Sequence, residues 1–192
     1  MTTKQKISKE ALRLFSIRGY EATSVRDIAK AVGIKDSSLY NHYKSKQDIF
    51  DTIVNEYKME SANEFEQFCK ENDCTRPEIL KKSAVAIIAA FLDPCVVQTR
   101  KMLTMEMYHN KEAKDVYYKL FYKEPASWCD IVFEQLIEAG VLEQENQEAL
   151  FYEFYGPLFT LLLETDLLEI SKDTVLERAV TQAERFIENH RR

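Results

Sequence analysis

Apolar residues recur at helical spacing from the start of the chain. Ile7, Ala11, Leu14 and Phe15 occupy positions i, i+4, i+7 and i+8, which lie on one face of an α-helix. Gly19 follows, and glycine is typical of a helix end because it adopts the left-handed backbone conformation at little cost. The pattern therefore predicts a first helix that ends just before residue 19.

Two shorter helices are predicted next. Ser24 and Asp27 have the spacing of a capping box, an apolar stripe follows, and Gly33 closes this helix after about two turns. A third short helix fits residues 36–43, with Leu39 as its inward anchor. A short helix, a glycine turn and another short helix, placed after a longer helix, form the layout of a helix-turn-helix unit.

The rest of the chain continues the helical pattern. We expect helices over about residues 46–69, 77–92, 96–109, 112–139, 146–166 and 173–190, with a bend near Pro125 because proline lacks the backbone N–H. Only 4 Gly and 4 Pro occur, and alternating strand patterns are absent. The predicted fold class is all-α with about nine helices, an N-terminal three-helix head in residues 1–46 and a C-terminal helical body in residues 47–192.

Charge is distributed unevenly between these two parts. Residues 1–50 hold ten Lys and Arg against five Asp and Glu, a net charge of +5. The whole chain carries −6, so residues 51–192 carry −11. A basic head on an acidic body indicates that only the head meets a polyanion. A charge of +5 also fits a solvated helix face, so charge alone supports nucleic-acid binding only weakly.

One part of the chain resembles a known family of DNA-binding proteins. Residues 11–34, ALRLFSIRGYEATSVRDIAKAVGI, and residues 38–46, SLYNHYKSK, resemble the DNA-binding domain of TetR/AcrR-family transcriptional regulators. The resemblance covers about a quarter of the chain and keeps the glycines, the helix lengths and the Tyr-Lys-x-Lys exit in register. It implies a domain that binds an operator in double-stranded DNA, and a body that forms a homodimer and receives a small-molecule effector.

The second helix of a helix-turn-helix lies in the major groove, where its first residues reach base edges. Lys35, Ser37 and Ser38 lie at this end of the predicted helix. The N-terminus of the preceding helix favours a phosphate, and lysines just after the motif suit phosphates as well. The resemblance adds the middle of the recognition helix, which often contacts phosphates in the family. The predicted DNA-binding residues are Thr23, Ser24, Lys35, Ser37, Ser38, Tyr40, Asn41, His42, Lys44 and Lys46.

The chain departs from the family at the start of the recognition helix. Many members have serine or threonine at the position of Lys35, where the side chain caps the helix. A lysine cannot accept this hydrogen bond, so either Asp36 caps instead or the turn differs by one residue. The carboxylate of Asp36 is also unfavourable beside DNA unless it accepts from the amino group of a cytosine. The base preference therefore stays open.

The last two predicted helices each carry an apolar stripe. By family resemblance and by pattern, the two stripes packed against their copies form a four-helix bundle that makes the homodimer. Alternatively, one stripe serves only the core of the chain itself, and a helix with apolar residues on two sides can do both. The predicted dimerisation residues are Phe151, Tyr155, Phe159, Leu162, Leu176, Val180, Ala183 and Ile187.

The middle helices are rich in methionine and aromatic residues. Adaptable methionines and amphipathic tyrosines suit an apolar pocket with a few hydrogen-bonding groups. The resemblance assigns such a pocket to a small-molecule effector, and the acidic surroundings favour a neutral, apolar or cationic one. Simple core packing is the alternative for each of these residues. The predicted effector-binding residues are Met102, Met105, Tyr108, Tyr117, Phe121, Trp128 and Tyr152.

Other classes of protein lack support in the sequence. No enzyme motif of the GxGxxG, P-loop, GxSxG or HExxH type occurs. Glu106 and His109 have the i, i+3 spacing of helical di-iron sites, but such sites need a second copy of the motif, so we expect neither a metal nor another cofactor. Four cysteines without a CxxC pair are expected to be reduced thiols. The longest apolar run, residues 84–92, is too short to cross a bilayer, so we expect a cytoplasmic protein without a membrane partner.

The sequence thus predicts a ligand-responsive, DNA-binding transcriptional regulator. We expect a repressor that binds a palindromic operator as a dimer and is released by a small-molecule effector. One alternative is a DNA-binding regulator that is controlled by a protein partner or lacks an effector, and a filled core between the middle helices favours it. A helical small-molecule carrier or enzyme is the other, and it needs a cavity with convergent titratable groups.

Overall fold

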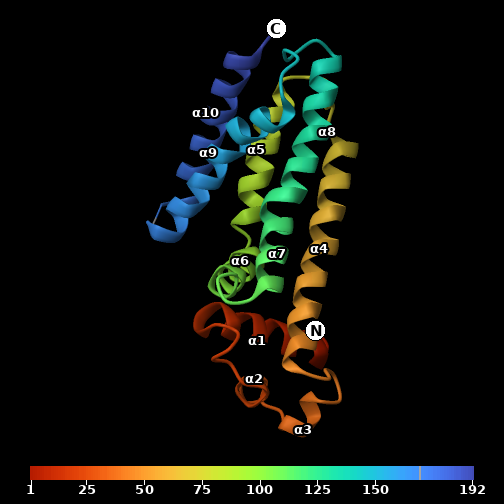
Figure 1. Ribbon diagram of the computed structural model, residues 1–192, viewed down its shortest axis with the longest axis vertical. Coiled ribbons are helices and arrows are strands. Elements are labelled where there is room, and N and C mark those ends of the chain that lie inside the picture. Colours follow the sequence, from red (N-terminus) through yellow and green to blue (C-terminus); the bar gives the residue numbers. More distant parts are fainter. Residues whose placement is uncertain (169) are drawn as a thin grey trace. The chain divides into compact units, whose positions relative to one another are not determined.

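The chain has an all-α fold in the part that the structure describes. The computed structural model (Figure 1) describes residues 1–168 and 170–192, and the side chains of all of these except residues 57–64. No helix among the described residues has both the length and the apolar character needed to span a membrane. The elements are α1 (Thr3–Arg18), α2 (Val25–Val32), α3 (Asp36–Leu39), α4 (Lys46–Glu71), α5 (Glu78–Phe91), α6 (Pro94–Glu106), α7 (Lys111–Tyr118), η1 (Lys119–Lys123), α8 (Glu124–Glu138), α9 (Gln147–Leu167) and α10 (Lys172–His190).

This arrangement confirms the predicted fold class, with three helices at the N-terminus followed by a helical body. Contacts within the chain divide it into two compact units. The N-terminal unit comprises Met1–Asn63 and Pro94–Phe121, and the C-terminal unit comprises Glu64–Asp93 and Tyr122–Arg192. Helix α6 packs against α1, and α7 packs against α6. A functional boundary after residue 46 stays a prediction, because these units are defined by packing alone.

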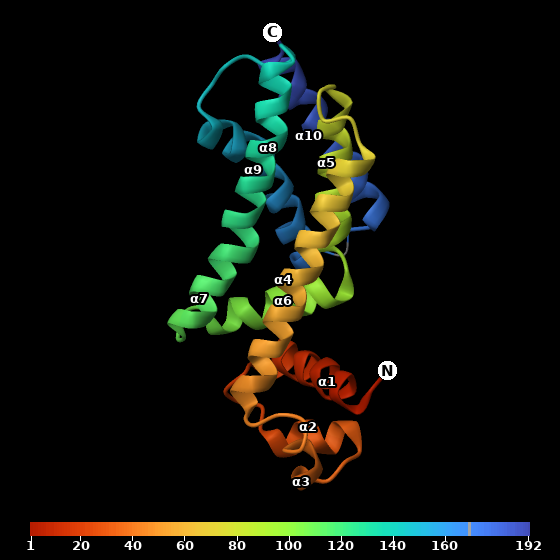
Figure 2. The same cartoon turned by 90° about the vertical axis from the view of Figure 1, so that its right-hand side faces the viewer.

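Helix α1 packs against both α2 and α6 in the N-terminal unit (Figure 2). Its predicted inner face is buried, with Ile7, Ala11 and Phe15 fully inaccessible to solvent. Ile28 of α2 and Leu39 of α3 are fully buried as well. Burying such a side chain contributes about 1.5–3 kcal/mol relative to leaving it exposed. This core therefore holds helices that are too short to be stable alone.

Helix α2 is fixed at both ends by local hydrogen bonds. The hydroxyl of Ser24 accepts from the N–H of Asp27 at 3.1 Å, and the carboxylate of Asp27 accepts from the N–H of Ser24 at 2.9 Å. The predicted capping box is therefore confirmed, and hydrogen bonds from Ser24 lower the pKa of Asp27. At the other end, Gly33 has φ 78° and donates its N–H to the carbonyls that close the helix. Only glycine adopts this left-handed conformation readily.

The long helix predicted over residues 112–139 is wrong as a single element. Helices α7 and α8 are joined by the π-helical segment η1, which lies just before Pro125. Pro125 lies in the first turn of α8 and cannot donate a backbone N–H, so regular α-helical hydrogen bonding is interrupted in the turn before it. A π-type segment absorbs such an interruption within an otherwise helical stretch. The described residues accordingly contain ten α-helices where the sequence predicted about nine.

Three phenylalanines from three helices pack together in the C-terminal unit. Phe133 of α8, Phe154 of α9 and Phe186 of α10 have ring centroids 5.8, 5.6 and 5.3 Å apart. Aromatic pairs at such distances contribute about 0.5–1.5 kcal/mol beyond the area they bury. Helix α10 also lies along α5. The aromatic cluster therefore fixes α8, α9 and α10 against one another.

The last residue of α10 ties this helix to the loop after α8 and to α9. The ring of His190 lies 2.9 Å through Nδ1 from Glu145 and 2.9 Å through Nε2 from Glu153. A neutral imidazole carries only one N–H, so both contacts are hydrogen bonds only when the ring is protonated. Burial lowers the pKa of His190, but the two carboxylates outweigh this effect and raise it overall. The backbone N–H of Glu143 also donates to the carbonyl of His190 at 3.0 Å.

Replacement His190→Gln is expected to remove a pH-dependent part of the stability. Folding raises the pKa of His190 above its unfolded value of about 6.5. The protonated ring therefore stabilises the fold fully below about pH 6.5, and this contribution is lost as the pH rises through the raised folded pKa. Both carboxylates are partly exposed, so we expect on the order of 1 kcal/mol. Urea unfolding of both proteins between about pH 5 and pH 9 measures the difference.

Glu148→Gln is the matched control, because Glu148 is an exposed carboxylate in the first turn of α9. This variant should keep the wild-type dependence of the unfolding free energy on pH. An identical pH dependence in wild type and His190→Gln would contradict the protonated histidine clamp.

Candidate nucleic-acid interface

The accessible face of the helix-turn-helix extends from residue 35 to residue 44. Helix α3 is short, but the chain continues to turn past its end, with the N–H of Tyr43 donating to the carbonyl of Leu39 at 3.1 Å. Both of these side chains are buried. Their burial directs the remaining residues of the turn outwards. The exposed residues are Lys35, Ser37, Tyr40, Asn41, His42 and Lys44, while Ser38 is half-buried.

Helix α3 begins without a side-chain cap. Lys35 occupies the N-cap position and Asp36 is the first helical residue, so the prediction that Asp36 caps the helix is wrong and the turn keeps its register. The carboxylate of Asp36 instead accepts a hydrogen bond from Nε of Arg26 at 3.2 Å. This ion pair joins α2 to α3 and offsets a negative charge that would repel DNA.

Arg26 is a candidate contact that the sequence did not reveal. Its side chain is 84% exposed, and its ion pair with Asp36 brings the guanidinium beside the start of α3. An exposed pair of this kind contributes little to stability. The planar guanidinium suits a phosphate or a guanine, and the bond through Nε leaves its terminal N–H groups as donors. The two partners lie ten positions apart in the sequence, so no local spacing signals the pair.

The two residues predicted at the N-terminus of α2 have structural roles. Thr23 is buried, and its hydroxyl donates to the carbonyl of Gly19 at 2.8 Å. Ser24 is exposed, but its hydroxyl belongs to the capping box. Both hydroxyls therefore hold the turn between α1 and α2. A contact of either residue with a phosphate stays a prediction.

Lys44 and Lys46, which the sequence assigned to the same role, differ in their surroundings. The side chain of Lys44 is exposed. Nζ of Lys46 donates to the carbonyl of Tyr20 at 2.7 Å and lies 4.1 Å from the centroid of its ring. The ammonium group of Lys46 is thus engaged within the protein, which leaves Lys44 as the better candidate for a phosphate.

A hydroxyl pair connects the end of the recognition turn to α1. The hydroxyl groups of Ser8 and Tyr43 lie 2.5 Å apart in the core, and the Tyr43 hydroxyl also donates to the carbonyl of Lys4 at 3.3 Å. Burial raises the pKa of Tyr43, so the phenol stays protonated as a donor. The turn that presents His42 and Lys44 is therefore fixed to the first helix.

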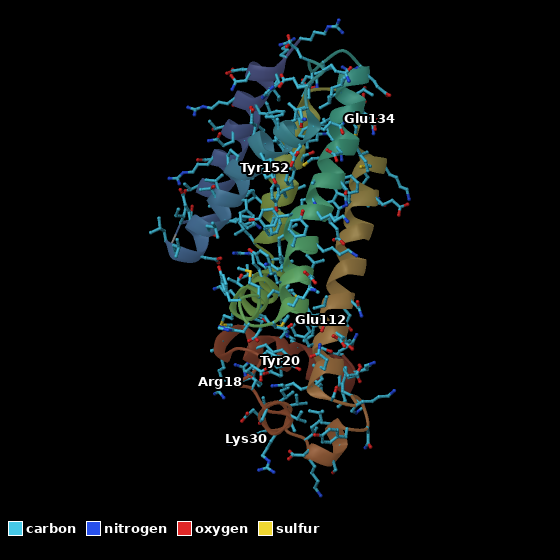
Figure 3. The ribbon with its side chains drawn as sticks, viewed as in Figure 1. Arg18, Tyr20, Lys30, Glu112, Glu134 and Tyr152 are labelled. Atoms are coloured by element: carbon cyan, nitrogen blue, oxygen red, sulfur yellow. The ribbon has the colours of Figure 1, made fainter. Side chains whose placement is uncertain are left out.

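The predicted effector-binding residues are dispersed over the described structure. Met102 and Phe121 are fully buried, Met105, Tyr108 and Tyr152 are exposed, and Tyr117 and Trp128 are half-buried. Trp128 and Tyr152, the latter labelled in Figure 3, belong to the C-terminal unit, and the other five belong to the N-terminal unit. Their role as one set of ligand contacts stays a prediction.

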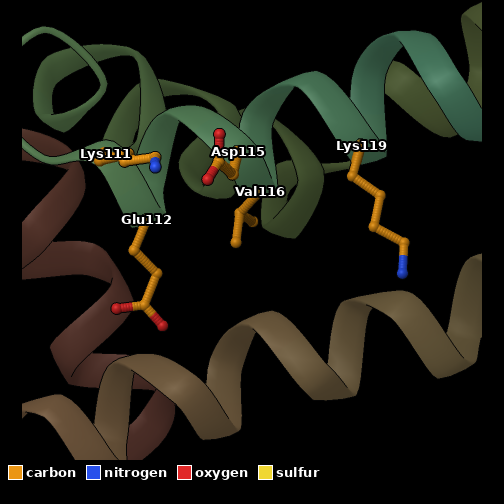
Figure 4. Close-up of a pocket in the computed structure, with 5 residues that line it drawn as sticks. All are labelled: Lys111, Glu112, Asp115, Val116 and Lys119. Carbon is orange, nitrogen blue, oxygen red and sulfur yellow. The ribbon is translucent and has the colours of Figure 1, made fainter.

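An open hollow of about 510 Å³ lies beside α7 in the N-terminal unit. Its lining is Lys111, Glu112, Asp115, Val116 and Lys119. Figure 4 shows Glu112, Val116 and Lys119 pointing to the same side of the helix. Two ammonium groups, two carboxylates and one apolar side chain can bind a small polar molecule. The predicted pocket residues are not among this lining, although Tyr117 is its neighbour in sequence.

The predicted dimerisation residues divide into two groups. Phe151, Tyr155, Leu162 and Ala183 are buried within the chain, so the side chains of these four pack in its own core. Phe159, Leu176, Val180 and Ile187 are half-buried. Only the second group keeps surface that another chain can reach.

Helix α9 also carries apolar residues on its outer side that the prediction omitted. Tyr152, Leu163 and Leu167 are 58%, 43% and 81% exposed. They lie at i, i+11 and i+15, close to whole turns of the helix, so they share one face. Because α9 is apolar around its circumference, hydrophobic periodicity alone does not distinguish this face from the buried one.

Replacement Lys46→Met is expected to destabilise the fold by about 1–2 kcal/mol, because it removes the hydrogen bond to the Tyr20 carbonyl and the contact with its ring. Lys44→Met is the matched control, with the same change of charge two residues earlier, and should shift stability by less than about 0.5 kcal/mol. Urea unfolding measures both. Equal effects of the two replacements would contradict the assignment of the Lys46 ammonium group to Tyr20.

The N-terminal segment that forms this candidate interface is similar to known regulatory proteins. Residues 7–53 match the family described as bacterial regulatory proteins, tetR family. Over 51 residues the chain is 49% identical to the biofilm operon icaADBC HTH-type negative transcriptional regulator IcaR of Staphylococcus aureus strain Newman. This match covers 27% of the chain and 27% of the relative, so the chain spans about a quarter of the curated protein that it matches.

Two solved structures share the fold over almost the whole chain. A TetR-family transcriptional regulator from Mesorhizobium loti has a TM-score of 0.80 at 17% identity, with 99% of this chain and 97% of that chain covered. The fatty acid degradation regulator FadR from Bacillus halodurans has a TM-score of 0.75 at 18% identity, with 100% and 98% covered. Identities this low show the fold alone. Residues 7–53 thus match the tetR family of bacterial regulatory proteins, and the chain shares its fold with TetR-family transcriptional regulators.

Proposed function

We propose that this protein is a TetR-family transcriptional repressor that binds its operator as a homodimer. The observation that carries the proposal is the accessible face of the helix-turn-helix, where Lys35, Ser37 and Lys44 are exposed on a turn held by a buried core. The S. aureus relative that is 49% identical in this segment is named a negative regulator. The same direction of control is therefore proposed for this chain.

The polar groups on this face suit two kinds of contact with DNA. At the start of α3, Lys35 can donate to O6 and N7 of guanine, and Ser37 can donate to or accept from several bases. Arg26, held by Asp36, adds a second cation at this end. Further along, the exposed Lys44 would contact the phosphate backbone, and such contacts fix the register without reading sequence.

The outer face of α9 is the proposed centre of the homodimer. Tyr152, Leu163 and Leu167 expose apolar surface to water, and a second copy of the chain would cover it. The half-buried Val180 and Ile187 of α10 would extend the same contact. A dimer presents two recognition helices to two half-sites of a palindromic operator, which multiplies the affinity of each head.

The hollow beside α7 is the proposed place of a small-molecule effector. Its mixed charges suit a small polar or zwitterionic molecule better than a purely apolar one, whereas the sequence favoured a neutral, apolar or cationic effector. An effector that binds the DNA-free conformation more tightly would shift the population towards it and release the operator.

DNA binding is tested by fluorescence anisotropy with a duplex from the region upstream of the gene, over a series of salt concentrations. Lys44→Ala is expected to weaken binding and to reduce the slope of log K against log salt by about 1, because one phosphate contact is lost. Lys172→Ala in α10 is the matched control, an exposed lysine outside the N-terminal unit, and should keep the wild-type slope. Equal affinity of the wild type for upstream DNA and for a random duplex would overturn the proposal.

Dimerisation is tested by a charge on the outer face of α9. Leu163→Glu is expected to halve the molecular mass in light scattering and to weaken binding to a two-half-site operator by at least about tenfold, because a buried unpaired carboxylate is costly. Ile131→Glu is the matched control, since Ile131 of α8 is exposed to the same 43%. Monomer formation by both variants, or by neither, contradicts an interface centred on α9.

A further inference from the structure

A buried glutamate connects α6 to the turn from which the helix-turn-helix starts. Glu106, the last residue of α6, is 7% exposed. Its Oε1 accepts the backbone N–H of Tyr20 at 2.8 Å, across 86 positions of sequence. Tyr20 lies between α1 and α2 and is labelled in Figure 3 beside α1. A carboxylate at a buried amide forms a stronger hydrogen bond than a neutral acceptor does.

The chain approaches this carboxylate through a glycine. Gly19 has φ +84°, a backbone conformation that other residues rarely adopt. A Cβ at this position would also lie 3.3 Å from Oε1 of Glu106, closer than most such contacts. Backbone conformation and space therefore both favour glycine where the carboxylate meets the turn.

Tyr20 also forms hydrogen bonds with α4 and packs against aromatic rings of the core. Its carbonyl accepts from Nζ of Lys46 at 2.7 Å, and its hydroxyl donates to Gln47 at 3.0 Å. Its ring lies 5.2 Å from that of Phe15 and 5.4 Å from that of Phe50. The backbone of this one residue is thus held by an anion from α6 at its N–H and by a cation from α4 at its carbonyl.

The other side of Glu106 leads directly to α7. Its carbonyl accepts the N–H groups of His109 at 3.0 Å and Asn110 at 2.8 Å, which folds the connection between the helices into a tight turn. Asn110 caps α7 by accepting from Glu112 at 2.9 Å and Ala113 at 3.2 Å. Glu112 also lines the hollow. A displacement of α7 by a molecule in the hollow would therefore reach Glu106 through a few hydrogen-bonded residues.

We infer that Glu106 is a positioning residue for DNA recognition: by holding the N–H of Tyr20, its carboxylate sets the turn from which α2 and α3 extend and links this turn to the hollow beside α7. The inference rests on the proposed operator binding. The residue touches no DNA itself. Its carboxylate acts by keeping one arrangement of the turn, and loss of the bond lets α2 and α3 adopt others, so fewer molecules present the recognition helix correctly.

The test compares Glu106→Ala with Glu106→Gln. Glutamine keeps the shape and an oxygen acceptor for the N–H of Tyr20, whereas alanine removes both. Operator affinity is measured by anisotropy well below the melting temperature of each variant, so that only folded protein is compared. We expect Glu106→Ala to bind about tenfold more weakly and Glu106→Gln to stay within about threefold of wild type. Should the alanine variant be too unstable, Glu106→Asp, which is one methylene shorter, replaces it.

Amide hydrogen exchange at Tyr20 is the second readout, because it reports the bond itself without DNA. Protection should fall in Glu106→Ala and persist in Glu106→Gln. Thr99→Val is the matched control, since Thr99 is a fully buried polar residue of the same helix whose hydroxyl has no hydrogen-bond partner among the described residues. This variant should change neither protection nor affinity.

The outcomes separate the two proposals. Unchanged Tyr20 protection in Glu106→Ala overturns the role of the carboxylate in holding the turn. Reduced protection with wild-type operator affinity overturns the positioning role and leaves only a contribution to stability. If the wild type does not prefer its upstream DNA, the proposed function fails and with it the recognition role, whereas hydrogen exchange still decides whether Glu106 holds the turn.

Discussion

The backbone N–H and carbonyl of Tyr20 form hydrogen bonds with side chains, because this residue lies between two helices. Between the end of α1 and the start of α2 the chain has no regular hydrogen-bond ladder, and a buried N–H without a partner costs about 1–3 kcal/mol. Glu106 supplies the acceptor for this N–H, and Lys46 supplies a donor for the carbonyl of the same residue. Side chains from α6 and α4 therefore hold the turn that leads into α2, and Gly33 with a short turn joins α2 to α3.

Helices α2 and α3 are short and need support from the rest of the fold. Helices α2 and α3 have 8 and 4 residues, far below the length at which an isolated helix is stable in water. Buried Ile28 and Leu39 hold them to the core, and this leaves their outer face polar and accessible. The C-terminal unit differs, because its longer helices pack through Phe133, Phe154 and Phe186. Helix α9 of this unit also exposes apolar side chains on its outer side. The proposed dimer would bury this exposed apolar surface of α9.

Some features of the fold and of the candidate interface could be predicted from the sequence, and others could not. The stripe of α1, the capping box at Ser24 and the closing glycine at position 33 were all predicted, because each depends on neighbours within a few residues. The donor to Asp36 was not, since its carboxylate accepts from Arg26 across ten positions of sequence. The π-helical segment before Pro125 was predicted only as a bend, because a missing N–H indicates an interruption but not the form it takes.

The sequence by itself determined the buried stripe of α1, the capping box and closing glycine of α2 and the family resemblance of the first helices, because helical period and capping are set by residues three to four apart. Two lysines were predicted to contact phosphates, and only the tertiary structure distinguished them. The side chain of Lys44 is exposed, whereas the ammonium group of Lys46 bonds to Tyr20. The tertiary structure also decided which side of α9 faces water and which distant carboxylate, that of Glu106, completes the turn. Burial and long-range hydrogen bonds depend on where other helices pack, and the spacing of residues within one helix does not indicate those positions.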